Sequence, residues 1–407
     1  MNQKKFQRSI EVALLWHSLD SDNLGVGALA IGHIYLISSV AKEAGYEVKF
    51  TTVGTPNSDG KNARVEVERI VGHKIEHVVY SPRKIISSIK KLKLDKLGLF
   101  NKFDVVFDIG EGDSFTDIYG TSRFLRLFFS KLHVLVNKRP LIIAPQTIGP
   151  FKKRKSSLMA KFILKNASKV FIRDIKSRDV FQSLLPNSKS IQVIDVAFAM
   201  PFTKNIEIAS QTVGINVSGL LFNGGYTGGN QFGLKDDYPE FIEELIRYFV
   251  EETAYNVELV SHVISDEQAL EDDYRACVHL AKMFNDVKVA PKFNNPIEAK
   301  SYISGYSLFL GSRMHATIAA FSTSVPVIPL AYSRKFDGLF RTLGYEHSLD
   351  LKELTKESLM SEIKDKISKN ESLALDLNLA IKTANNYLNE YKRGLLEVLE
   401  LSYENNK

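Results

Sequence analysis

Residues 306–330 constrain the fold more than any other stretch, because two apolar runs there flank a glycine turn and a short run of small residues. The runs 306–310 and 325–330 are strand-like. Between them, Gly311 favours a tight turn, and 316–321 is small and apolar, as in a short buried helix. Two consecutive strands joined through a helix pair in parallel. The stretch therefore predicts a strand, a tight glycine turn, a short helix and a second strand.

The same turn brings two reactive side chains together. We expect Ser312 to cap the helix, which puts Arg313 and His315 in its first turn. The free N–H groups of a helix N-terminus favour an anion. A guanidinium can bind a carboxylate or phosphate through two hydrogen bonds, and an imidazole can transfer a proton. The alternative interpretation is a surface arginine beside a core-facing histidine.

With 407 residues, 44% hydrophobic and 25% charged, the chain is expected to form two ordinary globular domains. Its single cysteine, Cys277, rules out an internal disulfide framework and fits a reducing compartment. Residues 1–8 are polar and basic, and 10–16 are too few for the apolar core of a signal peptide. No apolar run reaches the roughly 18 residues of a membrane span. We therefore expect a cytoplasmic protein.

The net charge of +6 and the pI near 9.0 favour anionic partners. Phosphorylated substrates, an anionic membrane surface and nucleic acid are the candidates, and nucleic acid is not expected because its common binding signatures are missing. A basic and apolar segment at 84–99 and the run 152–155 are usually solvated faces. The alternative is peripheral contact with an anionic bilayer, at the inner face of the membrane, or with a lipid-linked diphosphate.

The first strand, at 11–16, leads into a loop that contains Asn23, Gly25 and Gly27, followed by a helix at 28–44. A glycine-containing loop at the carboxyl end of a strand is where open α/β sheets bind ligands. Gly25-x-Gly27 alone is a weak phosphate-binding signal, and plain turn chemistry explains it equally well.

Several motifs together resemble the polysaccharide pyruvyl transferase family. They are the turn 311–316, Ala319-Ala320, the strand 325–328, Tyr332 with Lys335, the run Gln146-Thr147-Ile148-Gly149-Pro150, and the turn Gly110–Asp117. The chain departs from the family at two places. Residues 322–324 replace the usual glycine before Val-Pro, and Val26 stands where the first loop usually has an aspartate.

The resemblance covers nearly the whole chain and implies two doubly wound Rossmann-like domains that face each other across a cleft, as in GT-B glycosyltransferases. Residues 1–203 would form the N-terminal, acceptor-side domain, and 210–375 the C-terminal, donor-side domain. Residues 376–407 would be a helix that braces the N-terminal domain. The loop 220–237, with five glycines, is a candidate lid.

The implied reaction transfers the enolpyruvyl group of phosphoenolpyruvate to two hydroxyls of a sugar of a cell-surface polysaccharide or its precursor, forming a pyruvate ketal and phosphate. Arg313 and Arg173 would hold the anion, His315 would be the general acid and Asp117 the base. Further substrate-binding candidates are Asn23, Gly25, Asp113, Gln146, His262, Tyr332 and Lys335.

Structural alternatives apply to three of these side chains. Asp113 could simply cap a helix, Arg173 could pair with Asp174 or Asp179, and His262 could be a core histidine. Asp272 and Asp273 are expected to face solvent. No cluster has metal-ligand spacing, so we expect neither a metal nor a cofactor besides the donor. Oligomeric state and the carrier of the acceptor, whether lipid or nucleotide, are not predicted.

Two other functions stay open. One is a GT-B glycosyltransferase that uses a nucleotide sugar, although the E-x₇-E pattern common there is not evident around 311–340. The other is a non-catalytic sugar- or phosphate-binding protein on the same scaffold.

Overall fold

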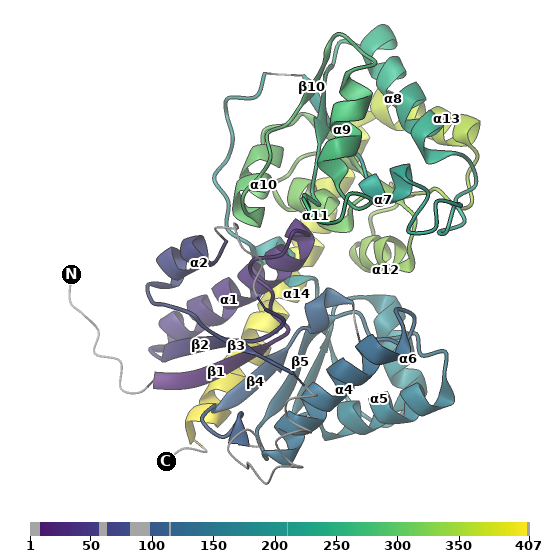
Figure 1. The fold of residues 1–407 in the computed structure, drawn as a ribbon. Coiled ribbons are helices and arrows are strands. Elements are labelled where there is room, and N and C mark those ends of the chain that lie inside the picture. The colour runs from purple at the N-terminus through teal and green to yellow at the C-terminus, as the bar shows by residue number, and fades with distance from the viewer. Residues whose placement is uncertain (1–8, 57–62, 82–97, 114, 210, 405–407) are drawn as a thin grey trace, which may run out of the picture.

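The computed structural model describes residues 9–56, 63–81, 98–113, 115–209 and 211–404. Two parallel sheets flanked by helices form two domains, one above the other in Figure 1. The sheets span 9–192 and 212–350, which confirms the α/β prediction. The basic and apolar segment predicted at 84–99 lies almost wholly outside the described residues.

The first sheet has seven parallel strands in the order β3-β2-β1-β4-β5-β6-β7. Their bounds are Ser9–Leu15 (β1), Glu47–Gly54 (β2), Glu76–Val79 (β3), Val105–Asp108 (β4), Leu141–Gln146 (β5), Lys169–Ile172 (β6) and Ile191–Gln192 (β7). The chain order reverses between β1 and β4. Ligands of open parallel sheets bind at the carboxyl ends of the strands beside such a reversal.

The second sheet has six strands in the order β10-β9-β8-β11-β12-β13. Their bounds are Thr212–Asn216 (β8), Asn256–Val260 (β9), Val287–Val289 (β10), Leu308–Gly311 (β11), Val327–Ala331 (β12) and Leu349–Asp350 (β13). Here the order reverses between β8 and β11. The turn that carries Arg313 and His315 follows β11, so it lies at this second reversal.

Helices cover both faces of each sheet. Those of the first domain are Leu24–Ala44 (α1), Ala63–Val71 (α2), Thr121–Val136 (α4), Arg154–Asn166 (α5) and Ile175–Leu184 (α6), with 3₁₀ turns Gly110–Gly112 (η2) and Val196–Ala199 (η3). Those of the second are Gly219–Phe222 (α7), Tyr238–Glu252 (α8), Asp273–Ala281 (α9), Pro296–Ile303 (α10), Met314–Ser322 (α11), Arg334–Leu343 (α12) and Lys356–Ser368 (α13). The last helix is Asn370–Glu404 (α14).

Helix α1 is long and apolar enough to cross a membrane by length and composition, which the sequence reading did not identify. However, 78% of its apolar window is buried inside the protein. The helix lies in the core that β1, β2 and α14 share with it. Asn23 caps its start by accepting from the N–H of Gly25, and Gly45, at φ 82°, ends it in the left-handed conformation.

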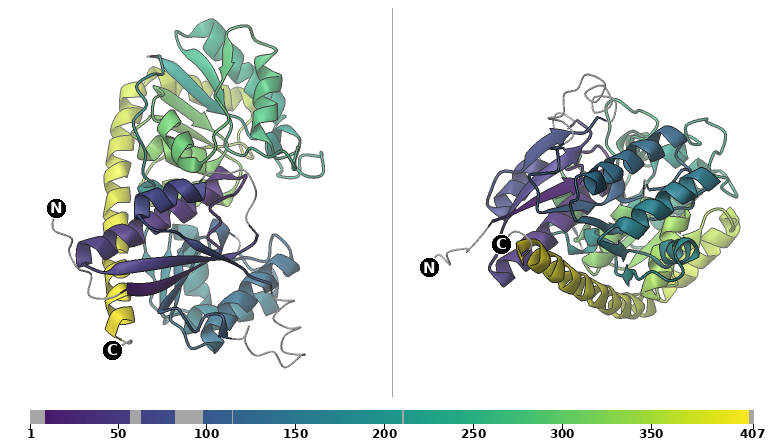
Figure 2. Two further views of the ribbon diagram at one scale, coloured as in Figure 1. Left: turned by 60° about the vertical axis from the view of Figure 1, so that its left-hand side comes forward. Right: turned by 90° about the horizontal axis from the view of Figure 1, so that it is seen from below.

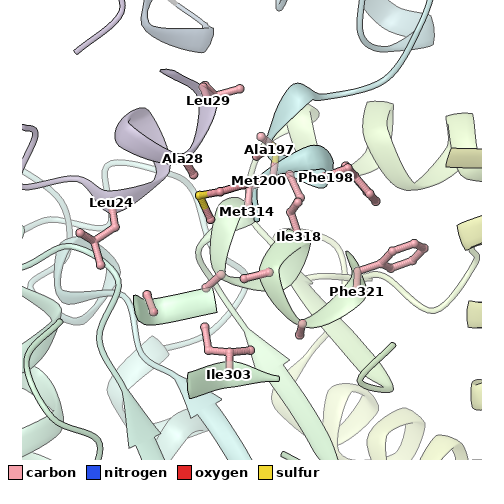
Figure 3. Close-up of a cluster of buried hydrophobic side chains, with 14 of the residues drawn as sticks. Leu24, Ala28, Leu29, Ala197, Phe198, Met200, Ile303, Met314, Ile318 and Phe321 are labelled. Atoms are coloured by element: carbon pink, nitrogen blue, oxygen red, sulfur yellow. The ribbon is translucent and has the colours of Figure 1, made fainter. Parts of the chain in front are cut away.

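An apolar cluster joins the two domains (Figure 3). Its members come from α1, η3 and α11: Leu24, Ala28, Leu29, Ala197, Phe198, Met314, Ile318 and Phe321. The rings of Phe198 and Phe321 meet edge to face, 5.6 Å apart. The start of α11 is therefore held directly against the first domain.

Helix α14 runs along both domains (Figure 2) and contacts α1 and β1 of the first and α11, α12 and α13 of the second. It begins at Asn370, six residues before the predicted start of the brace. Its buried residues divide between the domains, with Leu377 near the start and Tyr391 and Leu395 further along.

A chain of buried hydrogen bonds links α14 to the end of β1. His17 Nδ1 lies 3.1 Å from the carbonyl oxygen of Leu15, and His17 Nε2 lies 2.7 Å from His33 Nδ1. His33 Nε2 lies 2.6 Å from the hydroxyl of Tyr391. Since a carbonyl can only accept, His17 must carry its proton on Nδ1, so His33 donates to His17 and Tyr391 donates to His33. Each of these hydrogen bonds therefore has one donor and one acceptor while both imidazoles are neutral.

Burial makes this arrangement sensitive to acid. It lowers the pKa of His17 to about 3, and burial followed by the charge of His17 lowers the pKa of His33 well below its usual value. In the unfolded chain both histidines titrate near 6.5. Below that pH the unfolded state binds more protons than the folded state, so the free energy of unfolding decreases as the pH falls from about 6.5 towards 3.

We therefore expect the thermal unfolding midpoint to fall when the pH is lowered from 7.5 to 5.5. Each histidine should reduce the free energy of unfolding by up to roughly 1.4 kcal/mol per pH unit. The variant His33→Phe should show a shallower dependence, and the control His279→Ala, in the second domain, should keep the wild-type slope. Equal slopes in wild type and His33→Phe would show that this hydrogen-bond chain is not the cause.

Candidate active site

The turn after β11 differs by one residue from the prediction. Helix α11 begins at Met314, so Arg313 is its cap residue and only His315 lies in the first turn. The Ser312 hydroxyl does not cap the helix, because it accepts from Tyr238 at 2.7 Å. The N–H of Arg313 donates to Asn216 Oδ1 at 2.8 Å, which fixes the turn to the end of β8.

The guanidinium of Arg313 is paired with a buried carboxylate. Nη2 and Nε donate to Asp273 Oδ1 at 2.7 and 3.2 Å, and Nη2 also donates to the carbonyl of Glu271 at 3.0 Å. Burial opposes the charge of Arg313, but the carboxylate of Asp273 outweighs it and raises the pKa. Within the described residues, Nη1 forms no hydrogen bond, so it is the donor left for an anion.

The expectation that Asp272 and Asp273 face solvent is wrong. Asp272 is the N-cap of α9 and almost fully buried, and Asp273 is completely buried. Asp273 accepts from the N–H groups of Gly219, His262 and Val263 at 2.8 to 3.1 Å, in addition to its bonds with Arg313. One carboxylate thus ties together the segments that follow β8, β9 and β11.

His315 reaches from the second domain to the first. Its Nε2 lies 3.7 Å from Asp195 Oδ2, beyond hydrogen-bond distance, and has no hydrogen-bond partner among the described residues. The ring packs on Gly25, where an added Cβ would lie only 2.4 Å from Nδ1. Glycine at position 25 is therefore required for the close approach of the two domains at this point.

Arg173 lies at the carboxyl end of β6, as predicted, but its partner is Asp195. Nη1 donates to Asp195 Oδ2 at 2.6 Å, and Nη2 donates to Thr147 Oγ1 at 2.8 Å. Asp195 is fully buried and also accepts from the N–H of Ala197. Burial opposes the ionised form of Asp195, but Arg173 and then His315 outweigh it and lower its pKa.

Two predicted substrate-binding residues pair with each other across the domains. Lys335, on α12, forms an ion pair with Asp113, and the hydroxyl of Tyr119 donates to Asp113 at 2.7 Å. Burial would raise the pKa of Asp113, but Lys335 lowers it to about 2. The ring of Tyr332 packs on Phe232 of the glycine-rich loop, with ring centroids 5.3 Å apart.

Two other candidates, Asp117 and Gln146, form hydrogen bonds that hold the fold together. Both carboxylate oxygens of Asp117 accept backbone N–H groups, those of Lys152 and Lys153, at 2.7 and 2.9 Å. Burial opposes ionisation of Asp117, but these bonds hold its pKa below the usual value, so it is poorly suited to act as the base. Gln146 is fully buried and donates to Asp108, whose carboxylate also pairs with the buried Lys131.

His262 and Asn23 meet at a backbone contact between the domains. The N–H of Leu24 donates to the carbonyl of His262 at 3.1 Å, and Asn23 forms an antiparallel bridge with Val263. Burial of the His262 ring, followed by the charges of His315 and Arg313, lowers the pKa of His262 to about 3. The first loop thus lies beside His315, although Asn23 itself acts as a helix cap.

A cavity of about 320 Å³ opens on the other side of this loop, at the carboxyl ends of β1, β2 and β3. Its lining is mostly polar: His17, Ser18, Asp20, Ser21, Asp22, Val26, Gly54, Thr55, Pro56, His77, Glu111, Arg123 and Gln268. Gln268 comes from the second domain. Arg313 and His315 are not part of the lining, but Val26 is next to Gly25, on which His315 packs.

Sequence reasoning missed Asp195, Asp273 and the acidic lining of this cavity. Only the position of Asp195, directly after an apolar run at the end of the first domain, could have indicated a site. Among the described residues, no group of three or more His, Cys, Asp or Glu side chains could hold a metal ion.

A family model described as polysaccharide pyruvyl transferase matches residues 23–334. The amylovoran biosynthesis protein AmsJ of Erwinia amylovora is 22% identical over 306 residues, which cover 71% of this chain and 70% of that protein. The matched residues include the turn after β11 and the other candidates in the site except Lys335, which lies one residue beyond the match.

Solved structures show the same architecture. The UDP-GlcNAc 2-epimerase of Neisseria meningitidis bound to UDP-GlcNAc has a TM-score of 0.58 at 13% identity, covering 96% of this chain and 100% of that one. Anabaena HepE in complex with UDP and glucose has a TM-score of 0.56 at 11% identity, covering 96% and 99%. At these identities the likeness concerns the fold alone, and it confirms two Rossmann-like domains arranged as in GT-B proteins.

Proposed function

This chain belongs to the polysaccharide pyruvyl transferase family and is an enzyme of pyruvyl transfer in polysaccharide biosynthesis, and from that premise we propose that its donor is phosphoenolpyruvate and its product a pyruvate ketal on a sugar. The observation that carries the proposal is the contact between the domains at Asp195. A proton-transferring group, His315, and an anion-binding group, Arg173, approach the same carboxylate there.

The donor is a small, dense anion with a carboxylate and a phosphate. Arg313, Arg173 and Lys335 are the candidate cations of the site, and each is paired with a carboxylate of the protein. Phosphoenolpyruvate would have to join or displace these pairs. The Lys335–Asp113 pair is the easiest to displace, because its side chains are 28% and 17% exposed, whereas Asp273 and Asp195 are fully buried.

His315 is the proposed general acid. It would give a proton to C3 of the enol, whose C2 is then attacked by the first sugar hydroxyl. Loss of inorganic phosphate from C2 and attack by the second hydroxyl close the ketal. One hydroxyl proton restores the histidine and the other leaves with phosphate, so the reaction balances without a redox step or another cofactor.

Asp195 replaces Asp117 in this proposal as the carboxylate next to the reacting groups. It is fully buried, and Arg173 holds it ionised. Lying 3.7 Å from His315 Nε2, it would give the imidazolium an anionic neighbour. Asp195 acts through His315, so we regard it as a positioning residue.

The cavity beside the first loop is the proposed acceptor site. Three carboxylates, Asp20, Asp22 and Glu111, line the cavity beside one arginine, Arg123, and this excess of acceptors suits a polyhydroxylated sugar better than a phosphate. Its volume of about 320 Å³ lies at the lower end of small-molecule sites. Two structural relatives, one bound to UDP-GlcNAc and one to UDP and glucose, hold carbohydrate on the same fold, which favours a sugar ligand.

Calorimetry on the full-length protein tests the donor. We expect phosphoenolpyruvate to bind, UDP-glucose and UDP-GlcNAc to bind far more weakly, and the affinity for phosphoenolpyruvate to be the same with and without EDTA. Tight binding of a UDP-sugar with none of phosphoenolpyruvate would replace the proposal with a nucleotide-sugar glycosyltransferase. Binding that requires a divalent ion would contradict the proposed absence of a metal.

A further inference from the structure

One stretch of the first domain is strongly basic. Residues 118–173 contain 13 lysines and arginines and no aspartate or glutamate, although the whole chain carries a net charge of only +6. The cations are Arg123, Arg126, Lys131, Lys138, Arg139, Lys152, Lys153, Arg154, Lys155, Lys161, Lys165, Lys169 and Arg173. The excess positive charge is therefore local, and no acidic residue within the stretch offsets it.

The stretch includes α4 and α5, which pack side by side on one face of the first sheet (Figure 1). Their apolar residues belong to the core cluster of that face, whereas α1 and α14 belong to the cluster on the other face (Figure 2). The outer surface of α5 thus points away from α14.

Helix α5 exposes apolar and basic side chains together. Leu158 and Phe162, one helical turn apart, are 59% and 49% exposed. Four cations lie at three- and four-residue spacing from this pair, and all four are exposed: Arg154, Lys155, Lys161 and Lys165. With Leu158 and Phe162 they form what we call the α5 face. On α4, Phe129 and Val136 are also exposed, at 41% and 66%.

The cations of the α5 face are not neutralised by any carboxylate among the described residues. Other cations of the stretch do have carboxylate partners: Arg123 pairs with Glu111, Lys131 with Asp108, Lys169 with Glu397 and Arg173 with Asp195. For Arg154, Lys155, Lys161 and Lys165, no ion pair forms within the part of the chain that the structure describes. Their charge is directed outward.

We propose that the α5 face binds the surface of an anionic lipid bilayer. Unpaired lysines and arginines attract anionic headgroups, and an exposed Leu–Phe pair between them can enter the interfacial region, as in helices that lie in the plane of a membrane. A nucleic acid would use the charges but gives no role to two exposed aliphatic and aromatic side chains on one helical stripe. The run 152–155, predicted from the sequence to meet a membrane, leads directly into this face.

The α5 face is separate from the proposed donor and acceptor sites, so its binding to lipid can be tested without substrate. The full-length protein is sedimented with phosphatidylcholine vesicles that either contain or lack phosphatidylglycerol. We expect binding to the anionic vesicles at low salt and release at high salt. Lys161→Glu/Lys165→Glu should weaken binding at least roughly tenfold, because each basic residue near the surface contributes to the attraction.

A charge-matched control separates local from general electrostatics. Lys282→Glu/Lys288→Glu makes the same change in net charge at exposed lysines of the second domain and should leave vesicle binding close to wild type. Leu158→Ser/Phe162→Ser, which changes no charge, should weaken vesicle binding and leave binding to a single-stranded RNA unchanged.

Two outcomes would overturn the proposal. One is equal recovery with neutral and anionic vesicles. The other is an unaffected Leu158→Ser/Phe162→Ser variant together with tight RNA binding, which would identify the face as a polyanion site. All variants change exposed residues, and circular dichroism checks that each is folded.

Discussion

Replacing His315 with alanine should lower kcat by roughly 10²–10⁴-fold, the usual contribution of a general acid, while phosphoenolpyruvate still binds. The reason is the position of its ring. Nε2 has no hydrogen-bond partner among the described residues and approaches the carboxylate of Asp195, so the imidazole is free to give a proton, yet it is not one of the three cations proposed to hold the donor.

Initial rates and calorimetry on the same preparations test this expectation. His279→Ala, a histidine of the same domain outside the site, serves as the matched control and should keep wild-type turnover. Asp195→Asn should lower kcat less than His315→Ala and change its pH profile, because it alters the partner of the ring and leaves the imidazole in place. A His315→Ala enzyme with full turnover, or one that loses donor binding alone, would exclude the assigned role.

Of the substitutions proposed here, Arg313→Ala should lower the free energy of unfolding the most. It leaves the completely buried carboxylate of Asp273 without its cation, and breaking a buried ion pair costs about 3–5 kcal/mol. Although Asp273 keeps the N–H groups of Gly219, His262 and Val263, these are dipoles and only partly replace a full charge. Donor binding should be lost as well, by on the order of 2–3 kcal/mol or more.

A second cation separates the two effects. Lys335→Ala removes a positive charge from the site, so it should weaken donor binding. The ion pair between Lys335 and Asp113 is partly exposed, so its loss should change the unfolding midpoint little. Arg313→Lys keeps a charge next to Asp273 and should recover part of the stability. If Arg313→Ala unfolds at the wild-type temperature, the pair with Asp273 does not stabilise the fold in the way described.

The fold could be read from the sequence because its signals are local. The strand, glycine turn, helix and strand of 306–330 appear in the structure as β11, α11 and β12, and the position of Arg173 at the end of a strand was also correct. Both depend on patterns within a few residues of each other.

The partners of these residues could not be read in the same way. Asp273 looked like a solvated helix residue, because its burial comes from the ends of β8, β9 and β11, which lie far apart in the sequence. Asp195 follows a strand of only two residues, and its role in the site depends on its approach to His315 of the other domain. Asp117 was expected to be the base, yet its two carboxylate oxygens accept the backbone N–H groups of Lys152 and Lys153, which lie 35 and 36 residues further along the chain.

The long C-terminal helix has a consequence for how the protein is made. Tyr391 closes the hydrogen-bond chain on His33 and packs against Phe171 of β6, and Gly394 allows α14 to lie directly on the same ring. The first domain thus contains in its core residues that the ribosome adds only after the whole second domain. Although domains generally begin to fold from the N-terminus during synthesis, this one cannot complete its interior until the second domain and α14 have been synthesised. Premature termination would therefore leave the earliest-made domain, rather than the latest, with an open core.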